Sequence, residues 1–171
     1  FYASAGRSRE ALETIEQLLA SAPDNAMLHM THGALLEQRG RPGDALAAIQ
    51  RAVQISPANP WIRMQSAQGY VRAARPNEAA SEFLQAIQLD PRNTALRLQA
   101  AMFFLTTNQP PQALVHLREA ARLEPEASEV RGWLATAHMA SGALDDARRE
   151  IEVALRLDPN ESRILATAGQ V

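Results

Sequence analysis

The side chains that could do chemistry begin with two histidines one helical turn apart. His29 and His32 could share a metal ion if they lay on one face of a helix, because neutral imidazole is a common metal ligand. No carboxylate or third histidine is placed to complete a ligand set, so the sequence predicts no metal site there. The chain contains no Cys, which excludes disulfides, thiolate metal sites and cysteine nucleophiles.

Neighbouring acidic residues offer a second kind of chemistry. Asp145 and Asp146 are adjacent, and Glu124 and Glu126 are close together. Both pairs fall at predicted helix starts or turns, where solvated carboxylates favour the helix dipole, so we assign them no acid or base role. The sequence also lacks a glycine-rich phosphate loop and a nucleophile elbow. We therefore predict no catalytic residue and no cofactor, and we expect a protein that is not an enzyme.

Composition and charge restrict the class of protein. Hydrophobic residues make up 46% and charged residues 21% of the 171 residues, which is typical of a folded chain. No apolar run approaches the ~18 residues that cross a bilayer, so we expect no membrane insertion. The net charge of −2 argues against a polyanionic partner. The chain begins at Phe1 rather than Met, so we expect the true amino terminus and any targeting signal to lie elsewhere, and we assign no compartment.

A proline recurs every 34 residues and divides the chain into repeats. The spaced prolines are Pro23, Pro57, Pro91, Pro125 and Pro159. With each proline at position 32 of a 34-residue unit, residues 1–171 form one segment of repeats. Its four full units are 26–59, 60–93, 94–127 and 128–161, and its partial units are 1–25 and 162–171. A period of this length is typical of stacked helical repeats.

Each unit is predicted to form two helices, because the apolar residues of its second half fall at helical spacing. Position 20 is Ala and position 24 is large and apolar in every unit, facing a small residue at position 8, which lets two helices approach closely. Prolines at position 17 are expected to open the second helix, namely Pro42, Pro76 and Pro110. Glycines at position 15 are expected to end the first helix, namely Gly6, Gly40 and Gly142.

This pattern resembles the tetratricopeptide repeat family, whose units have this length. The unit 60–93 matches best, with Ala67, Tyr70, Ala79, Phe83 and Pro91 in register. The resemblance implies an all-α fold, a right-handed solenoid of antiparallel helix hairpins. In such a solenoid the first helices line a concave groove, the second helices form the convex back, and the stack usually binds other proteins.

The chain departs from the family at the aromatic position 4, where we expect the packing site either to be looser or to be covered by arginine stems. The residues at that position are His29, Arg63, Arg97, Arg131 and Leu165. His138 takes position 11, which holds Tyr2, Tyr70 and Phe104 in other units, so we expect it to pack as an aromatic side chain. His116 is expected to be exposed on a second helix. Second-helix arginines are expected to pair with Glu one turn away on the convex face: Arg118, Arg122, Arg148, Arg149 and Arg156.

In the family geometry, positions 2, 5, 6, 9, 12 and 13 of each first helix point into the groove. All five Met and both Trp of the chain fall on these positions. Thioethers and indoles offer adaptable apolar contact, and the Gln side chains beside them can bond a peptide backbone. The alternative is that these side chains pack against neighbouring first helices. The predicted partner-binding residues are Met27, Met30, Trp61, Met64, Gln65, Gln68, Leu98, Gln99, Met102, Trp133 and Met139.

The predicted partner is a neutral to apolar protein, peptide or helix. Charge is nearly absent from the groove positions, with Glu37, Arg72 and Glu129 as the exceptions. Nucleic acid is excluded as a partner because phosphate neutralisation requires a basic surface. Family members that hold carboxylate ends of chaperones use a Lys, Arg and Asn cluster that this chain lacks, so we do not expect chaperone-tail docking.

The sequence therefore predicts a non-catalytic interaction scaffold. All seventeen basic residues are Arg, a bias that with abundant Ala favours a bacterial source and an assembly, secretion or envelope-biogenesis system. One alternative is the substrate-recognition arm of a larger enzyme such as a sugar transferase, supported by Gln65 and Gln99 at position 6. Another is self-assembly, because both ends fall inside a hairpin and leave Ile164 and Leu165 without a following helix.

Overall fold

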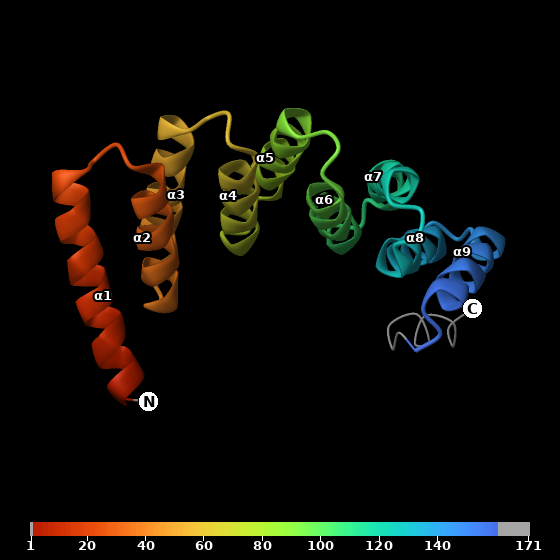
Figure 1. The fold of residues 1–171 in the computed structure, drawn as a ribbon, viewed down its shortest axis with the longest axis horizontal. Helices are drawn as coiled ribbons and strands as arrows, with labels where there is room; N and C mark the ends of the chain where they lie inside the picture. The colour runs from red at the N-terminus through yellow and green to blue at the C-terminus, as the bar shows by residue number, and fades with distance from the viewer. Residues whose placement is uncertain (1, 161–171) are drawn as a thin grey trace. The chain divides into compact units, whose positions relative to one another are not determined.

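The computed structural model describes the backbone of residues 2–160 and the side chains of residues 9–160. This part of the chain contains nine α-helices (Figure 1). They are α1 (Tyr2–Ser21), α2 (Ala26–Gln38), α3 (Pro42–Ile55), α4 (Pro60–Arg72), α5 (Pro76–Leu89), α6 (Thr94–Thr106), α7 (Pro110–Leu123), α8 (Ser128–Ala140) and α9 (Leu144–Leu157). Among them, no helix combines the length and the apolar character that a bilayer crossing requires.

The helices fall into two compact units, Phe1–Leu89 and Asp90–Val171. In the N-terminal unit α1 packs on α2, α2 pairs with α3 in a hairpin, and α3 packs on the second hairpin of α4 and α5. In the C-terminal unit the hairpins are α6 with α7 and α8 with α9, and α7 packs on α8. The fold is the all-α solenoid of helix hairpins that the sequence predicts.

Three of the four first helices begin at an asparagine cap at position 34 of the preceding repeat. The Oδ1 of Asn25 accepts hydrogen bonds from two backbone N–H groups of α2, at 3.0 and 3.2 Å. Asn59 does the same for α4 at 3.0 and 3.2 Å, and Asn93 accepts one N–H of α6 at 3.2 Å. Such caps satisfy backbone donors that have no partner inside the helix. Ala127 stands at this position before α8 and provides no side-chain cap.

Each hairpin turn contains one residue in the left-handed backbone region at position 15. Gly40 and Gly142 have φ of 69° and 75°, as suits a glycine that ends a helix. Ala74 and Asn108 occupy the same position with φ of 54° and 57°. The geometry of the turn therefore requires a positive φ at position 15, whatever the residue type. The position-17 prolines are the first residues of α3, α5 and α7, as predicted.

The expectation that Gly6 ends a first helix is wrong. Helix α1 runs without interruption from Tyr2 to Ser21 and passes through Gly6. A glycine inside a helix costs only about 1 kcal/mol relative to Ala, so it does not by itself end the helix. Position 17 of this unit, Ser8, is also not a proline. The predictions for Ile164 and Leu165 lie outside the described residues.

The small residues predicted to hold the hairpins together are buried. The position-20 alanines Ala45, Ala79, Ala113 and Ala147 have 0% exposure. Gly33, at position 8, faces the second helix so closely that an added Cβ would lie 3.0 Å from Cγ1 of Ile49. The opposition of small and large side chains read from the sequence is therefore the packing contact of the hairpin.

Candidate partner-binding site

A pocket lies between α2 and α4 on the first-helix face of the N-terminal unit. Its volume is about 260 Å³, slightly below the ~300–1,000 Å³ typical of small-molecule sites. A pocket of this size suits a large side chain better than a cofactor. Its lining contains Met27, Met30, Thr31, Ala34, Glu37, Ile49, Trp61, Gln65 and Arg72. Four of the predicted partner-binding residues, Met27, Met30, Trp61 and Gln65, are thus brought together.

The two rim residues of this pocket are accessible apolar side chains. Met27 is 54% and Trp61 is 43% exposed, which is high for such large apolar groups. Met30 is only 7% exposed, because it packs in a core cluster with Ile49 and Ile62. The pocket therefore has an exposed apolar rim and a buried apolar floor.

Sequence reasoning missed Ile49 as part of this pocket, because the residue belongs to a second helix. Gly33 on α2 and Gly69 on α4 both approach it, and an added Cβ on Gly69 would lie 3.2 Å from Cδ1 of Ile49. Without side chains at these two glycines, the second-helix side chain reaches the first-helix layer. Glycine at both position 8 of one unit and position 10 of the next was the signal available in the sequence.

The only charged residues lining the pocket, Glu37 and Arg72, pair with each other. The Nε of Arg72 donates to Oε1 of Glu37 at 2.5 Å, joining the C-terminal ends of α2 and α4. The two charges compensate, so the pocket has no net charge. Within the described part of the chain the carboxamide of Gln65 makes no hydrogen bond, and it can both donate and accept.

The remaining predicted residues do not line this pocket. Met64 and Gln68 are half-buried elsewhere on α4. In the C-terminal unit, α6 contacts α8 and carries half-buried predicted residues, as α8 does. These are Leu98, Gln99, Met102, Trp133 and Met139.

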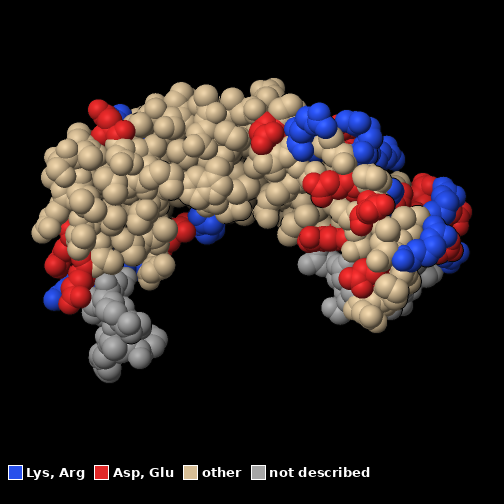
Figure 2. All heavy atoms as spheres, in the orientation of Figure 1, with Lys and Arg blue, Asp and Glu red and all other residues tan. Residues whose placement is uncertain are grey.

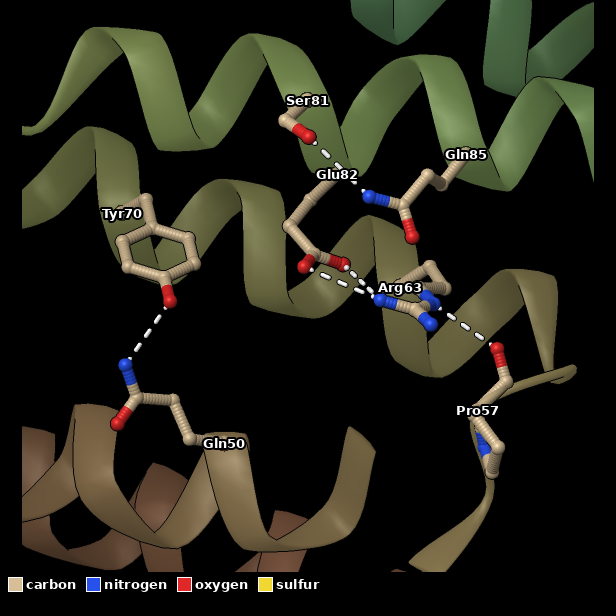
Figure 3. Close-up of polar contacts among 7 residues, drawn as sticks. All are labelled: Gln50, Pro57, Arg63, Tyr70, Ser81, Glu82 and Gln85. Carbon is tan, nitrogen blue, oxygen red and sulfur yellow. Dashed lines mark hydrogen bonds and ion pairs between the residues drawn. The ribbon is translucent and has the colours of Figure 1, made fainter. Parts of the chain in front are cut away.

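A polar network joins successive repeats on the other side of the first-helix layer (Figure 3). Arg63, at position 4, donates through Nε to the backbone carbonyl of Pro57 at 2.9 Å. Its Nη1 also donates to both carboxylate oxygens of Glu82 on α5, at 3.2 and 3.1 Å. Beside it, Nε2 of Gln50 donates to the hydroxyl of Tyr70 at 2.9 Å. One arginine therefore ties an inter-repeat turn to a second helix.

The bond from position 4 to the preceding proline carbonyl recurs in two other units. Arg97 donates to the carbonyl of Pro91, at 3.1 Å from Nε and 2.6 Å from Nη2. A ring nitrogen of His29 lies 2.8 Å from the carbonyl of Pro23. Arg131 instead pairs with Glu150, at 3.0 Å. At position 4, arginine therefore makes hydrogen bonds or an ion pair in all three units that carry it.

The histidines of the N-terminal unit do not converge on one point. His29 bonds the carbonyl of Pro23, whereas Nε2 of His32 lies 3.7 Å from Oε1 of Glu16. Within the described residues, no group of three or more His, Asp or Glu side chains is placed to hold a metal ion.

The expectation that His116 is exposed is wrong. The side chain is buried at 8% exposure and stacks on the ring of Phe104. Burial and the nearby Arg97 cation lower the pKa of His116 below its ordinary value. His138 is buried at 6% exposure, as predicted for a packed aromatic substitute.

Basic side chains of the C-terminal unit gather along the side of its second helices, α7 and α9, on the face seen in Figure 2, and acidic side chains lie beside them. Arg122 donates to both oxygens of Glu119, at 2.9 and 2.7 Å, and this pairing lowers the pKa of Glu119. Arg149 pairs with Asp146 one turn away. Arg122 thus pairs with Glu as expected, whereas Arg148 and Arg149 pair with Asp. Within the described residues Arg118 and Arg156 form no ion pair, so the expectation holds only in part.

Two models of the tetratricopeptide repeat family match the chain. One matches residues 36–101 and 104–171, and the other matches residues 2–60. Together they cover nearly the whole sequence. A search of curated proteins gives no match.

Solved structures show the same fold. YrrB, described as a TPR protein with an unusual peptide-binding site, is 15% identical with a TM-score of 0.79, over 99% of this chain and 87% of YrrB. TTC0263, a thermophilic TPR protein from Thermus thermophilus, is 22% identical with a TM-score of 0.66, over 98% of this chain and 92% of TTC0263. A MamA fragment from Desulfovibrio magneticus RS-1 is 12% identical with a TM-score of 0.77, over 93% of this chain and 90% of that fragment.

Proposed function

The chain belongs to the tetratricopeptide repeat family, and from that premise we propose that it is a non-catalytic scaffold that binds a neutral to apolar segment of a partner protein. Proteins of this fold act as protein–protein interaction scaffolds. The partner contacts first-helix residues, drawn from the eleven that the sequence analysis predicts.

The pocket between α2 and α4 is the observation that carries this proposal. Its rim exposes Met27 and Trp61, its floor is apolar, and its only two charges compensate each other. An exposed apolar rim next to a pocket favours a docking role, since contiguous apolar surface beside a cavity often marks an interaction site. Aromatic residues at the mouth of a pocket are also frequent binding hot spots.

The nature of the ligand follows from the lining. Gln65 offers a free carboxamide donor and acceptor for the backbone of an extended peptide. The solved structure of YrrB, whose fold this chain shares, is described as having a peptide-binding site, which supports a peptide over a small molecule. We further propose that the chain works in a bacterial assembly, secretion or envelope-biogenesis system. All its basic residues are Arg, and bacterial proteins share its fold, which supports this proposal.

A second candidate function is the substrate-recognition arm of a larger enzyme such as a sugar transferase. The free carboxamide of Gln65 favours it, because position 6 carries an amide in such arms. The full-length gene tests it directly, since a catalytic domain would be evident. Self-assembly through hairpin ends stays a third hypothesis, which light scattering on whole repeats tests.

The test of the main proposal is peptide selection followed by affinity measurement. A random peptide library is selected on the protein, and the enriched peptides are titrated against Trp61→Ala, Met102→Ala and Leu84→Ala. Leu84 is the matched control, because it is an apolar side chain of the N-terminal unit at 42% exposure, close to the 43% of Trp61, but on a second helix.

We expect Trp61→Ala to weaken binding by about tenfold or more, which corresponds to ~1.4 kcal/mol per factor of ten. Met102→Ala should weaken it by a smaller factor, and Leu84→Ala should leave it unchanged. Enriched peptides should be apolar and bind with little dependence on salt. Unchanged affinity in both Trp61→Ala and Met102→Ala would remove the first-helix faces from the function.

A further inference from the structure

A second cleft lies in the N-terminal unit, away from the first-helix pocket. It has a volume of about 350 Å³ and is bordered by α1, α2 and α3. The side chains that matter for its chemistry are Glu16, His32, Leu36 and Ala48. None of them belongs to the partner-binding residues discussed above.

The next repeat fills the equivalent place with its own side chains (Figure 3). Position 11 there is Tyr70, whose hydroxyl accepts a hydrogen bond from Gln50 at 2.9 Å. Positions 4 and 23 are Arg63 and Glu82, which pair at 3.1 Å with only 15% and 14% of their side chains exposed. An aromatic ring and an ion pair therefore occupy that place.

The units 94–127 and 128–161 also have a ring at position 11 and large side chains at positions 4 and 23. In one, Phe104 at position 11 stacks on His116 at position 23, with ring centroids 5.6 Å apart. In the other, His138 takes position 11 and Arg131 pairs with Glu150 at 3.0 Å. In each of these units a ring stands at position 11.

The unit 26–59 has smaller side chains at all three positions. Leu36 replaces the ring, His29 replaces the arginine, and Ala48 replaces the large side chain at position 23. Leu36 is buried at 2% exposure and forms an apolar floor. The cleft is thus the space that an aromatic ring at position 11 and larger side chains at positions 4 and 23 take up in the other units.

Two polar side chains at the cleft, His32 and Glu16, can form hydrogen bonds with one added hydroxyl group. The Nε2 atom of His32 is buried and makes no hydrogen bond, and it lies 3.7 Å from Oε1 of Glu16, too far for a direct bond. Glu16 stands at position 25, as Gln50 does in the following repeat, where Gln50 binds the hydroxyl of Tyr70. A hydroxyl placed here could accept from Nε2–H of His32 and donate to Glu16.

We propose that this cleft binds the phenol ring of a tyrosine side chain supplied by a partner protein. The ring lies on Leu36 and beside Ala48, in the place that Tyr70 takes in the next repeat. Its hydroxyl bonds His32 and Glu16. The partner thereby completes a repeat that lacks its own ring.

The charges around the cleft favour an uncharged ring over an ionic ligand. Arg41 pairs with Asp44 at 2.7 Å and Arg51 pairs with Asp24 at 2.9 Å. His29 is engaged with the carbonyl of Pro23 at 2.8 Å. The cations are compensated, so a phosphorylated or carboxylate ligand gains little from them.

The test uses N-acetyl-tyrosinamide and p-cresol as probes, each against the matched compound without the hydroxyl, N-acetyl-phenylalaninamide and toluene. Binding is followed by the NMR shifts of the backbone amides of α1, α2 and α3. We expect both hydroxylated probes to bind at these helices at least threefold more tightly than their partners. Equal affinity with and without the hydroxyl overturns the proposal. If p-cresol binds and N-acetyl-tyrosinamide does not, the ring does not come from a partner protein, and the site binds a free phenol instead.

Two variants test the site itself. His29→Arg with Ala48→Glu installs the ion pair of the next repeat in the cleft, and it should reduce probe binding at least tenfold while selected groove peptides bind unchanged. His32→Leu should remove the preference for the hydroxyl but leave the ring bound. Ala58→Glu, at an exposed turn outside the cleft, is the control and should change nothing. Retained binding in the double variant overturns the proposal, and retained preference in His32→Leu overturns the role of His32.

Discussion

The imidazole of His116 stacks on the phenyl ring of Phe104, with centroids 5.6 Å apart and the planes inclined by only 9°. The two residues come from α7 and α6, so the stack joins the helices of one hairpin. Arg97, on α6, interacts with the imidazole electrostatically. The stack places a titratable group in the core of the C-terminal unit, where its charged form is disfavoured.

The first prediction is that stability falls as the pH drops below neutrality because of His116. Burial, and to a lesser extent Arg97, lower the folded-state pKa of His116 below the ordinary value of 6.5. As the pH falls through 6.5, the unfolded chain takes up a proton that the folded chain resists, so the free energy of unfolding decreases. The decrease levels off below the folded-state pKa. Urea unfolding across this range measures it.

The control for this prediction is His116→Phe, which keeps a ring against Phe104 but cannot titrate. The variant should show a shallower loss of stability between neutral and mildly acidic pH than the unmodified protein. The stability of each protein well above pH 7, where His116 is neutral in both the folded and the unfolded chain, is the reference from which the loss on acidification is measured. Identical pH profiles would show that His116 does not carry the dependence.

The second prediction is that Ala74→Gly stabilises the protein by about 0.5–1 kcal/mol. Ala74 has a φ of 54°, in the left-handed region where Cβ is strained. Glycine relieves that strain, although its freer unfolded chain offsets part of the gain. Thermal unfolding measures the effect. Asn108→Gly at the same turn position should gain less, because Asn tolerates a φ of 57° better than Ala does, and an equal gain would contradict the strain argument.

The third prediction is that Gly33→Ala destabilises the N-terminal unit by about 1–3 kcal/mol. The added Cβ would lie 3.0 Å from Cγ1 of Ile49 and 3.1 Å from the backbone oxygen of Ala45. Backbone cannot yield cheaply, so the hairpin must open slightly. Gly43→Ala is the matched control, because nothing lies within 4 Å of its added Cβ, and it should be neutral or stabilising. A neutral Gly33→Ala would mean that the hairpin is looser than described.

The fourth prediction concerns the ion pair of Arg63 and Glu82. Arg63→Met leaves the carboxylate of Glu82 and the carbonyl of Pro57 without a donor in a half-buried site. We expect a loss of about 1–3 kcal/mol. The double variant Arg63→Met with Glu82→Leu should recover part of that loss, because it removes the stranded charge. Denaturant unfolding of the single and double variants measures both, and simple additivity would contradict coupling between the two residues.

Much of the fold could be predicted from spacing alone. The proline and alanine period locates the four hairpins, and Pro42, Pro76 and Pro110 stand at the predicted helix starts. Helix starts depend on local residue types such as proline, and buried helix faces depend on the spacing of apolar residues. Both can be identified in a single sequence, so these features were predicted correctly. The positive φ of Ala74 could not be predicted, because alanine rarely adopts that conformation and the spacing of the repeat does not indicate it.

The candidate site was only partly predictable. Periodicity grouped Met27, Trp61 and Gln65 on one face, but it could not show that Ile49 reaches the same pocket through two glycines. It also misplaced His116, because a polar residue type on a second helix reads as solvent-facing when its stacking partner is unknown. Contacts between helices involve pairs of residues that are distant in the chain, and a single sequence does not identify those pairs.

The bond from Arg63 to the carbonyl of Pro57 links position 4 of one repeat to position 32 of the repeat before it, and Arg97 with Pro91 forms the same bond. Three of the four full units thus carry half of this joint at their start, and Arg131, which pairs with Glu150 instead, is the exception. Duplicating or deleting a whole 34-residue block during gene evolution would bring matching halves together again, whereas an insertion of any other length would leave them out of step. The array can therefore lengthen or shorten in complete modules without new chemistry at the junction.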